Sequence, residues 1–193
     1  MAVLVPIKGF GVAKARLAGA VDAADRADLA RHLATRVLQA AWPLPVRVVC
    51  DDDEVAQWVA HHRASVVRQT EPGLNAAVTV GVRSLADDGV ERVIVAHADL
   101  PRARSLAHLS TGEPTSVLIV PDRHRDGSNV LVVPTGVGFR FAYGSGSFRA
   151  HVAEAARLGL AVTVVDDPDL AWDIDVPADL IALDEVVAAE DQP

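Results

Sequence analysis

The chain has 193 residues, a length that suits one domain with a full hydrophobic core. Half of the residues are hydrophobic and 23% are charged, which excludes a disordered or fibrous protein. The net charge of −8 argues against general binding to nucleic acid or to anionic membranes, which would repel it. A single cysteine, Cys50, excludes an intrachain disulfide and argues against a cysteine-based zinc site.

The N-terminal apolar run, Ala2–Ile7, lacks the preceding basic region of a secretory signal. No apolar stretch approaches the roughly 18 residues that a membrane helix needs. We therefore expect a cytoplasmic protein without a membrane segment. The sequence leaves the oligomeric state open, and a homo-oligomer is compatible with it.

Short β-branched runs alternate with amphipathic stretches along the chain. The runs predict strands at Ala2–Ile7, Val46–Cys50, Ser65–Arg68, Arg92–Ala96, Ser116–Val120, Asn129–Val133 and Ala161–Val165. The amphipathic stretches predict helices that begin after Asp22, cover Val55–His62, begin at Gly73, cover Ser147–Leu158 and begin at Pro177. Strands that are apolar on both faces and separated by helices are typical of a parallel sheet covered on both sides. The predicted fold is an α/β three-layer sandwich with a Rossmann-like, mostly parallel sheet.

The domain organisation follows from the same pattern. No linker or internal repeat divides the chain, so residues 1–187 are predicted to form a single domain, and 188–193 a frayed tail. In open α/β sheets, ligands bind at the carboxyl ends of the strands. Candidate functional residues are therefore those that follow the predicted strands.

The loop after the first strand reads KGFGVAKAR. Lys8, Lys14 and Arg16 lie in a stretch of 21 residues that contains no carboxylate. A glycine-containing loop with basic side chains can wrap a polyphosphate through backbone N–H groups and charge. It is not a Walker A loop, because no GK[ST] follows four residues after a glycine, and it is not a GxGxxG loop, because position 14 is Lys. A solvated loop that carries lysines is the alternative interpretation.

Carboxylates follow two other strands. Asp99 comes just after Arg92–Ala96, where a carboxylate often holds a divalent metal on a nucleotide's phosphates. Asp173 and Asp175 alternate along a short extended segment, and we expect them to point to opposite faces, so that only one shares a site with Asp99. The alternatives are a turn cap at Asp99 and a helix N-cap at Asp175.

A glycine- and serine-rich segment, Gly144–Ser147, leads directly into a predicted helix. Such a helix start offers free N–H groups and a positive dipole end, which suit a phosphate or carboxylate. Asp126–Asn129 is explained equally well as a turn. His151 fits a surface or packing role, and His97 has no nucleophile in a familiar context, so a hydrolase triad is unsupported.

Together these segments resemble one family across nearly the whole chain, in the order VPIKGFGVAKARL, EPGLNAAV, HADLP, DGSNVL, YGSGSFRAH and WDIDVPADL. The chain is similar to the 2-phospholactate/phosphoenolpyruvate guanylyltransferases, which make an early intermediate of the deazaflavin coenzyme F-420. The wider resemblance is to nucleotidyltransferases of the type-A glycosyltransferase-like fold, including molybdenum-cofactor guanylyltransferases. There are three departures, none of which removes a charge: Val176 and Ser128 stand where threonine is common, and His97-Ala98 precede Asp99 where a glycine is often found nearby.

The resemblance implies a role for each matched residue. Nucleotide-binding residues would be Pro6, Lys8, Lys14, Arg16, Glu71, Gly73, Leu74 and Asn75. Acceptor-binding residues would be Ser128, Asn129, Gly144, Ser145, Gly146 and Ser147. Asp99 and Asp175 would bind Mg²⁺, with Asp173 a further candidate, and Lys14, Arg16, Asp99 and Asp175 would carry catalysis.

The resemblance also implies a reaction. GMP would move from GTP to phosphoenolpyruvate or 2-phospho-L-lactate, with release of pyrophosphate. The Ala- and Arg-rich composition indicates a GC-rich genome, which favours phosphoenolpyruvate, the acceptor of actinobacterial members. Two alternatives stay open: a molybdenum-cofactor-type or sugar-phosphate nucleotidyltransferase, and a GTP-binding regulatory domain without turnover.

Overall fold

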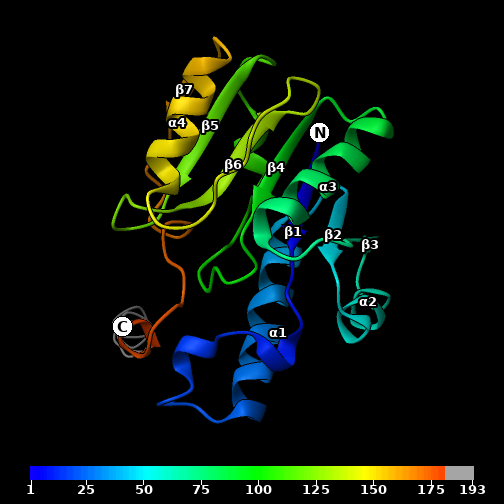
Figure 1. Cartoon of the computed structure of the whole chain (residues 1–193), viewed down its shortest axis with the longest axis vertical. Coiled ribbons are helices and arrows are strands. Elements are labelled where there is room, and N and C mark those ends of the chain that lie inside the picture. Colours follow the sequence, from blue (N-terminus) through cyan, green and yellow to red (C-terminus); the bar gives the residue numbers. More distant parts are fainter. Residues whose placement is uncertain (181–193) are drawn as a thin grey trace, which may run out of the picture.

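A computed structural model describes residues 1–180 of the chain. One seven-stranded sheet runs in the order β3-β2-β1-β4-β6-β5-β7 (Figure 1). Its strands are β1 (Ala2–Pro6), β2 (Val46–Cys50), β3 (Ala64–Arg68), β4 (Arg92–Ala96), β5 (Ser116–Pro121), β6 (Ser128–Pro134) and β7 (Ala161–Val164). All the predicted strands are therefore present, and the sheet is mostly parallel, as expected.

The helices are α1 (Ala23–Ala40), α2 (Asp53–Val59), α3 (Leu74–Asp87) and α4 (Ser147–Arg157), with 3-10 turns at Phe10–Val12, Ala15–Leu17 and Ala107–Ser110. Asp22 caps α1 by accepting a hydrogen bond from the Asp25 N–H at 2.9 Å, which explains where that helix begins. A helix also begins at Pro177, as predicted, and reaches the last described residue. The predicted domain end at 187 and the tail 188–193 lie outside the described residues.

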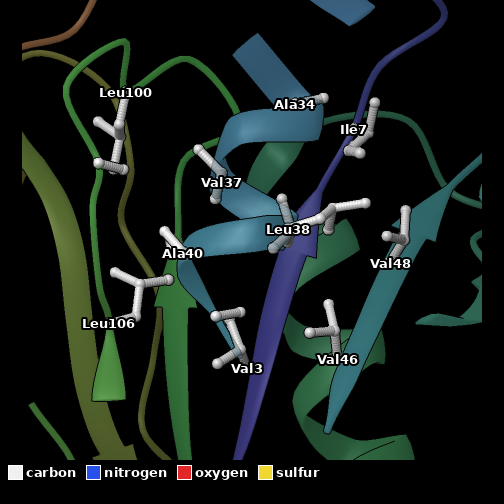
Figure 2. Packing of buried hydrophobic residues seen from close by; sticks show 14 of the residues in the cluster. Val3, Ile7, Ala34, Val37, Leu38, Ala40, Val46, Val48, Leu100 and Leu106 are labelled. Atoms are coloured by element: carbon white, nitrogen blue, oxygen red, sulfur yellow. The ribbon is translucent and has the colours of Figure 1, made fainter. Parts of the chain in front are cut away.

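The core forms one apolar layer on each face of the sheet. Val3 and Val5 of β1 pack into the layer covered by α1 and α2, whereas Leu4 packs into the layer below α3 and α4. Figure 2 shows the first layer, where side chains of α1 lie over β1 and β2. This alternation confirms the three-layer architecture. Within the described residues, no helix combines the length and apolar character that crossing a bilayer requires.

The approach of α3 to the sheet depends on Gly81. A Cβ atom at this position would lie 2.5 Å from Cδ1 of the buried Leu4. The absence of a side chain at Gly81 therefore lets α3 pack close to β1, which fixes where the first residues of α3 stand relative to the end of β1.

β6 runs antiparallel to both of its neighbours, β4 and β5. Only 122–127 connect β5 to β6, and a parallel connection would need a crossover of a dozen or more residues. The reversal brings the beginning of β6 to the same edge of the sheet as the ends of β1 and β4. The segments that form the site meet at that edge.

Candidate active site

A cavity of about 770 Å³ opens at this edge of the sheet. The loop after β1, the segment after β4, the β5–β6 turn, the start of α4 and the segment 173–175 line it. The predicted site residues among its lining are Pro6, Lys8, Lys14, Arg16, Leu74, Asp99, Asn129, Gly144, Ser145, Ser147, Asp173 and Asp175. Of the described residues with predicted roles, those outside the lining are Glu71, Gly73, Asn75, Ser128 and Gly146.

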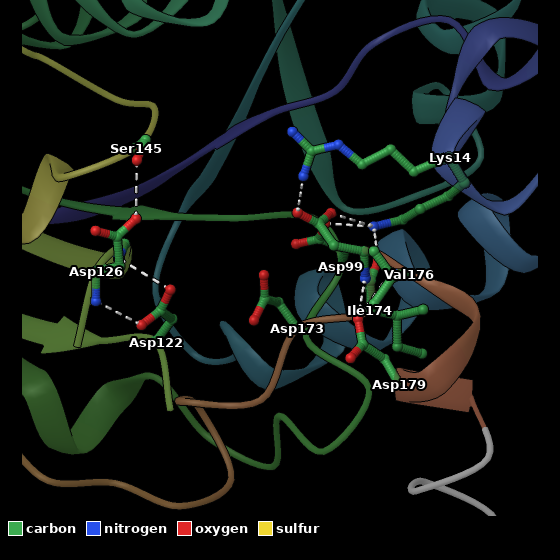
Figure 3. Close-up of polar contacts among 12 residues, drawn as sticks. Lys14, Asp99, Asp122, Asp126, Ser145, Asp173, Ile174, Val176 and Asp179 are labelled. Carbon is green, nitrogen blue, oxygen red and sulfur yellow. Dashed lines mark hydrogen bonds and ion pairs between the residues drawn. The ribbon is translucent and has the colours of Figure 1, made fainter. Parts of the chain in front are cut away.

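The Lys14 ammonium lies among the carboxylates that line one side of the cavity (Figure 3). Its Nζ donates hydrogen bonds to Oδ2 of Asp99 and to the Ile174 carbonyl, and lies 3.8 Å from Oδ1 of Asp175. The Lys14 side chain is only 9% exposed. Burial acts to raise the pKa of Asp99, but the Lys14 ammonium, supported by His97, outweighs it and holds that pKa below its ordinary value.

Arg16 pairs with Asp175 at the mouth of the cavity. Its Nη1 lies 3.1 Å from Oδ2 of Asp175, and the two side chains are 75% and 48% exposed. An exposed pair of this kind contributes little to stability because water screens it. Substrate oxygens can therefore replace Asp175 as the partner of Arg16 at little cost.

Asp173 and Asp175 both line the cavity, so the expectation that they point to opposite faces is wrong. Residues two apart in an extended segment share a face, and the fully buried Ile174 between them points the other way. Asp179 fixes this segment, since its Oδ2 accepts from the N–H groups of Asp175 and Val176 at 2.7 and 2.8 Å.

Three carboxylates, those of Asp99, Asp173 and Asp175, line the cavity around the single ammonium of Lys14. Burial raises the pKa of Asp173, and the neighbouring carboxylates of Asp99 and Asp175 raise it further. Oδ1 of Asp99 is buried and has no hydrogen-bond partner. A cation would relieve both conditions.

The carboxylates of the cavity suit a Mg²⁺ ion that takes part of its ligands from the substrate. Among residues 1–180, no group of three or more His, Cys, Asp or Glu side chains is assembled to hold a metal ion. Mg²⁺ usually takes one or two carboxylates and completes its shell with water and substrate phosphates. The carboxylates present therefore fit an ion that arrives with a phosphate-bearing substrate.

The β5–β6 turn brings two further carboxylates to the cavity, those of Asp122 and Asp126, neither of which was assigned a role in the site. Oδ1 of Asp122 accepts from the N–H groups of His124 and Asp126 at 3.0 and 2.9 Å, and Oδ2 accepts from Gly127 at 2.9 Å. Asp122 thus shapes the turn. An aspartate followed four residues later by Asp-Gly was the signal available in the sequence.

Asp126 also accepts hydrogen bonds from groups at the start of α4. Its Oδ2 accepts from the Gly146 N–H at 3.1 Å and from the Ser145 hydroxyl at 3.3 Å, and its carbonyl accepts from the Phe148 N–H. The Ser147 N–H donates to the carbonyl of Gly144. The expectation of free N–H groups at Gly144–Ser147 is therefore wrong for the N–H groups of Gly146 and Ser147, and the acceptor role of the segment stays a prediction.

Ser128 lies beneath the cavity wall. It is fully buried, its N–H donates to the Ser147 hydroxyl at 3.1 Å, and its own hydroxyl lies 3.0 Å from Nδ1 of His151. His151 is also fully buried, so its surface alternative is wrong and its packing alternative is confirmed. Ser128 and His151 therefore form a buried hydrogen-bonded layer beneath the cavity-lining Ser147.

Gly9, the first glycine of the loop after β1, is needed for packing. A Cβ at Gly9 would lie 2.6 Å from Oδ2 of Asp52, whose other carboxylate oxygen caps α2 by accepting from the Val55 N–H. Gly9 thus allows the loop to pass over the start of α2. Lys8 lines the cavity with an exposed side chain, compatible with its predicted contact to a nucleotide.

Comparison with known proteins places the chain among guanylyl transferases. Residues 1–188 match the family model described as guanylyl transferase CofC like. A Rubrobacter xylanophilus protein named phosphoenolpyruvate guanylyltransferase is 35% identical over 188 residues, which cover 94% of this chain and 92% of that protein. A Conexibacter woesei protein of the same name is 36% identical over 197 residues, covering 96% and 88%.

Solved structures agree at the level of the fold. A Desulfovibrio desulfuricans protein, described as a candidate nucleotide-diphospho-sugar transferase, matches with a TM-score of 0.71 and 21% identity, over 95% of this chain and 87% of that one. A Methanothermobacter nucleotidyl transferase matches with a TM-score of 0.66 and 16% identity, over 97% and 98%. The chain belongs to the family of CofC-like guanylyl transferases.

Proposed function

We propose that this protein transfers GMP from GTP to phosphoenolpyruvate and releases pyrophosphate. Several relatives at 30–36% identity carry the name phosphoenolpyruvate guanylyltransferase. The observation that carries the proposal is the cavity itself, in which Lys14 and Arg16 face Asp99 and Asp175 at the ligand edge of the sheet. Cations for a polyphosphate and carboxylates for a divalent ion are what nucleotidyl transfer needs.

The reaction is an in-line displacement at phosphorus. A phosphate oxygen of the acceptor forms a bond to the α-phosphorus of GTP. The bond between that phosphorus and the oxygen bridging to the β-phosphorus breaks, and its electron pair leaves with pyrophosphate. The second pKa of a phosphate monoester is about 6, so the nucleophile is already ionised at neutral pH and no general base is needed.

Repulsion between the two anionic substrates is the barrier that the site must lower. Lys14 and Arg16, each paired with a carboxylate in the free protein, would turn to the oxygens of the leaving pyrophosphate. Asp99 and Asp175 would hold Mg²⁺, with Asp173 as a further ligand candidate. When bound, Mg²⁺ would supply Lewis-acid stabilisation of charge on the transferring phosphate.

The acceptor would lie on the opposite side of the cavity, against Asn129, Gly144, Ser145 and Ser147, which line it there. Pro6, Lys8 and Leu74 line the side assigned to the nucleotide. Asp99, Asp173 and Asp175 line the same cavity and would hold the ion there, where it would supply positive charge to the anionic substrates.

The test is an acceptor screen with GTP and Mg²⁺, in which phosphoenolpyruvate and 2-phospho-L-lactate are offered in separate reactions. Pyrophosphate release and the mass of the nucleotide product are both followed. Release with phosphoenolpyruvate alone is the expected result. Release with 2-phospho-L-lactate alone would reassign the acceptor. GTP binding without release in either reaction would overturn the proposal in favour of another acceptor or a regulatory domain.

A further inference from the structure

The segment that leads into the acceptor side of the cavity has no regular structure of its own. Residues 138–143 lie between β6 and α4 and belong to neither a helix nor a strand. Their backbone N–H groups nevertheless need partners, because unpaired polar groups near a core are costly. Side chains of α3 and α4 provide partners for three of them, the N–H groups of Arg140, Ala142 and Tyr143.

Asn75, in the first turn of α3, makes two hydrogen bonds to one residue of this segment. Its Oδ1 accepts from the Tyr143 N–H at 2.6 Å, and its Nδ2 donates to the Tyr143 carbonyl at 3.3 Å. Both polar atoms of the side-chain amide are therefore engaged with the backbone. Asn75 thus joins the helix whose first residue, Leu74, lines the nucleotide side to the residue just before Gly144 on the acceptor side.

His151 and Glu154 hold the segment from α4. The Ala142 N–H donates to Nε2 of His151 at 3.1 Å, and the Arg140 N–H donates to Oε1 of Glu154 at 2.8 Å. Because Nε2 of His151 accepts, the ring proton of the neutral imidazole lies on Nδ1, which donates to the Ser128 hydroxyl at 3.0 Å. The two α4 residues are three apart and share a helix face, so they meet alternate N–H groups of an extended segment.

We propose that Asn75 and His151 are positioning residues that fix the backbone at Ala142–Tyr143 from two sides and so pre-form the acceptor side of the cavity. The proposal rests on the proposed function, which assigns that side to the acceptor. It replaces the predicted role of Asn75 as a nucleotide ligand. Neither residue touches the reacting atoms; both act through the loop that continues into Gly144.

Asn75→Ala is the informative variant, because the Asn75 side chain is exposed and its loss removes both bonds to Tyr143 without emptying the core. Two lost hydrogen bonds to the loop lead us to expect about a tenfold higher KM for phosphoenolpyruvate. The directly measured Kd for GTP should stay within about twofold, since Leu74 and the first loop are untouched. Deuterium uptake of peptides covering 139–147 should rise.

Thr79→Val is the matched control. The Thr79 hydroxyl donates to the Asn75 carbonyl at 2.7 Å, one turn along the same exposed face, and takes part in none of the loop hydrogen bonds described above. This variant should leave both substrate constants and the exchange of 139–147 as in wild type. Equal loss of GTP and acceptor affinity in Asn75→Ala, or unchanged exchange of 139–147, would overturn the proposal.

His151→Phe tests the hydrogen bond from α4, since it keeps an aromatic ring at this position and removes both hydrogen bonds of the imidazole. It should raise the KM for the acceptor and the exchange of 139–147 together, again with GTP binding retained; a rise in neither would remove His151 from the proposal. If this variant does not fold, Asn75→Ala decides alone. If the wild-type protein turns over no acceptor, the proposed function fails, and the exchange of 139–147 still decides whether Asn75 holds the loop.

Discussion

Lys14 combines an unusual backbone with a buried charge. Its φ of 54° is left-handed, which costs a non-glycine residue roughly 1–2 kcal/mol. The conformation directs Nζ into the cavity, where Asp99 and the Ile174 carbonyl receive it. Backbone strain of this kind persists where the surroundings over-determine it, which is typical of functional sites. The strain and the ion pair together indicate that the position of this ammonium matters for function.

Asp99→Asn tests the acidic cluster at this scale. The substitution keeps the shape of the side chain and removes the charge that pairs with Lys14 and would hold the cation. One oriented charge in such a site is worth roughly 3–4 kcal/mol, so kcat should fall by about 10² to 10³. Steady-state kinetics at saturating Mg²⁺ measure it. Asp53→Asn, an 88% exposed aspartate paired with Arg68 away from the cavity, is the control. Near-normal turnover of Asp99→Asn would exclude the metal role.

Ser147→Ala tests whether the Ser147 hydroxyl stabilises the fold, binds the acceptor, or does both. The Ser147 hydroxyl accepts the buried N–H of Ser128, so its removal leaves that donor without a partner. An unsatisfied buried group costs about 1–3 kcal/mol, and we expect the free energy of unfolding to fall by that amount. Urea denaturation measures it, and the KM for the acceptor should rise in parallel. An unchanged stability would show that the hydroxyl serves only the ligand.

The packing of α3 against the sheet depends on the close contact between Gly81 and Leu4. Alanine normally stabilises a helix interior by about 1 kcal/mol over glycine. At Gly81 the added methyl would meet Leu4, which is fully buried in β1 and has little room to move. Overpacking a core costs about 1–3 kcal/mol, so the substitution should be net destabilising despite the gain in helix propensity.

A double-mutant cycle with Gly81→Ala and Leu4→Val measures this packing. Leu4→Val alone should destabilise by leaving a cavity, and the two changes together should destabilise by less than their sum, because the smaller side chain makes room for the methyl. The free energy of unfolding from urea titrations gives all four corners. Strict additivity would mean that α3 moves away from the sheet instead.

For the whole molecule, His151 makes stability depend on pH. Burial lowers the pKa of His151 to about 4, and His97 adds to this while Glu154 opposes it. The unfolded chain, with an ordinary histidine pKa near 6.5, then binds more protons than the folded one, so stability falls as the pH drops below that value. We expect a loss of about 1.5 kcal/mol between pH 6.5 and pH 5. Urea denaturation at both values measures it, and in His151→Phe this part of the dependence should disappear.

Much of the fold could be predicted from the sequence because its strands are strongly apolar. β1 and β4 are buried on both faces, and a run such as AVLVP or RVIVA has few other uses. The direction of β6 was not predicted, although the short connection 122–127 already excluded a crossover helix. Local pattern identifies a strand, whereas pairing and direction depend on what the connection can reach.

The site was predicted at the level of its charges and less well at the level of its hydrogen bonds. Lys14, Asp99 and Asp175 come together as expected, because each follows a strand or precedes a helix at one edge. Asn75 and Asp126 have partners 68 and 20 residues away, Tyr143 and Gly146. Such pairings arise only when the chain is folded, so residue type and spacing do not reveal them.

The antiparallel strand β6 separates two parts of the sheet that contribute different walls of the cavity. β3, β2, β1 and β4 run parallel and carry the first loop and Asp99, while the β5–β6 hairpin and α4 carry the opposite wall. A turn that links two adjacent antiparallel strands can lengthen or change its composition without altering the strand order. The turn between β5 and β6, which carries Asp122 and Asp126 at the cavity, can therefore change in evolution while the strands that position Lys14 and Asp99 keep their order.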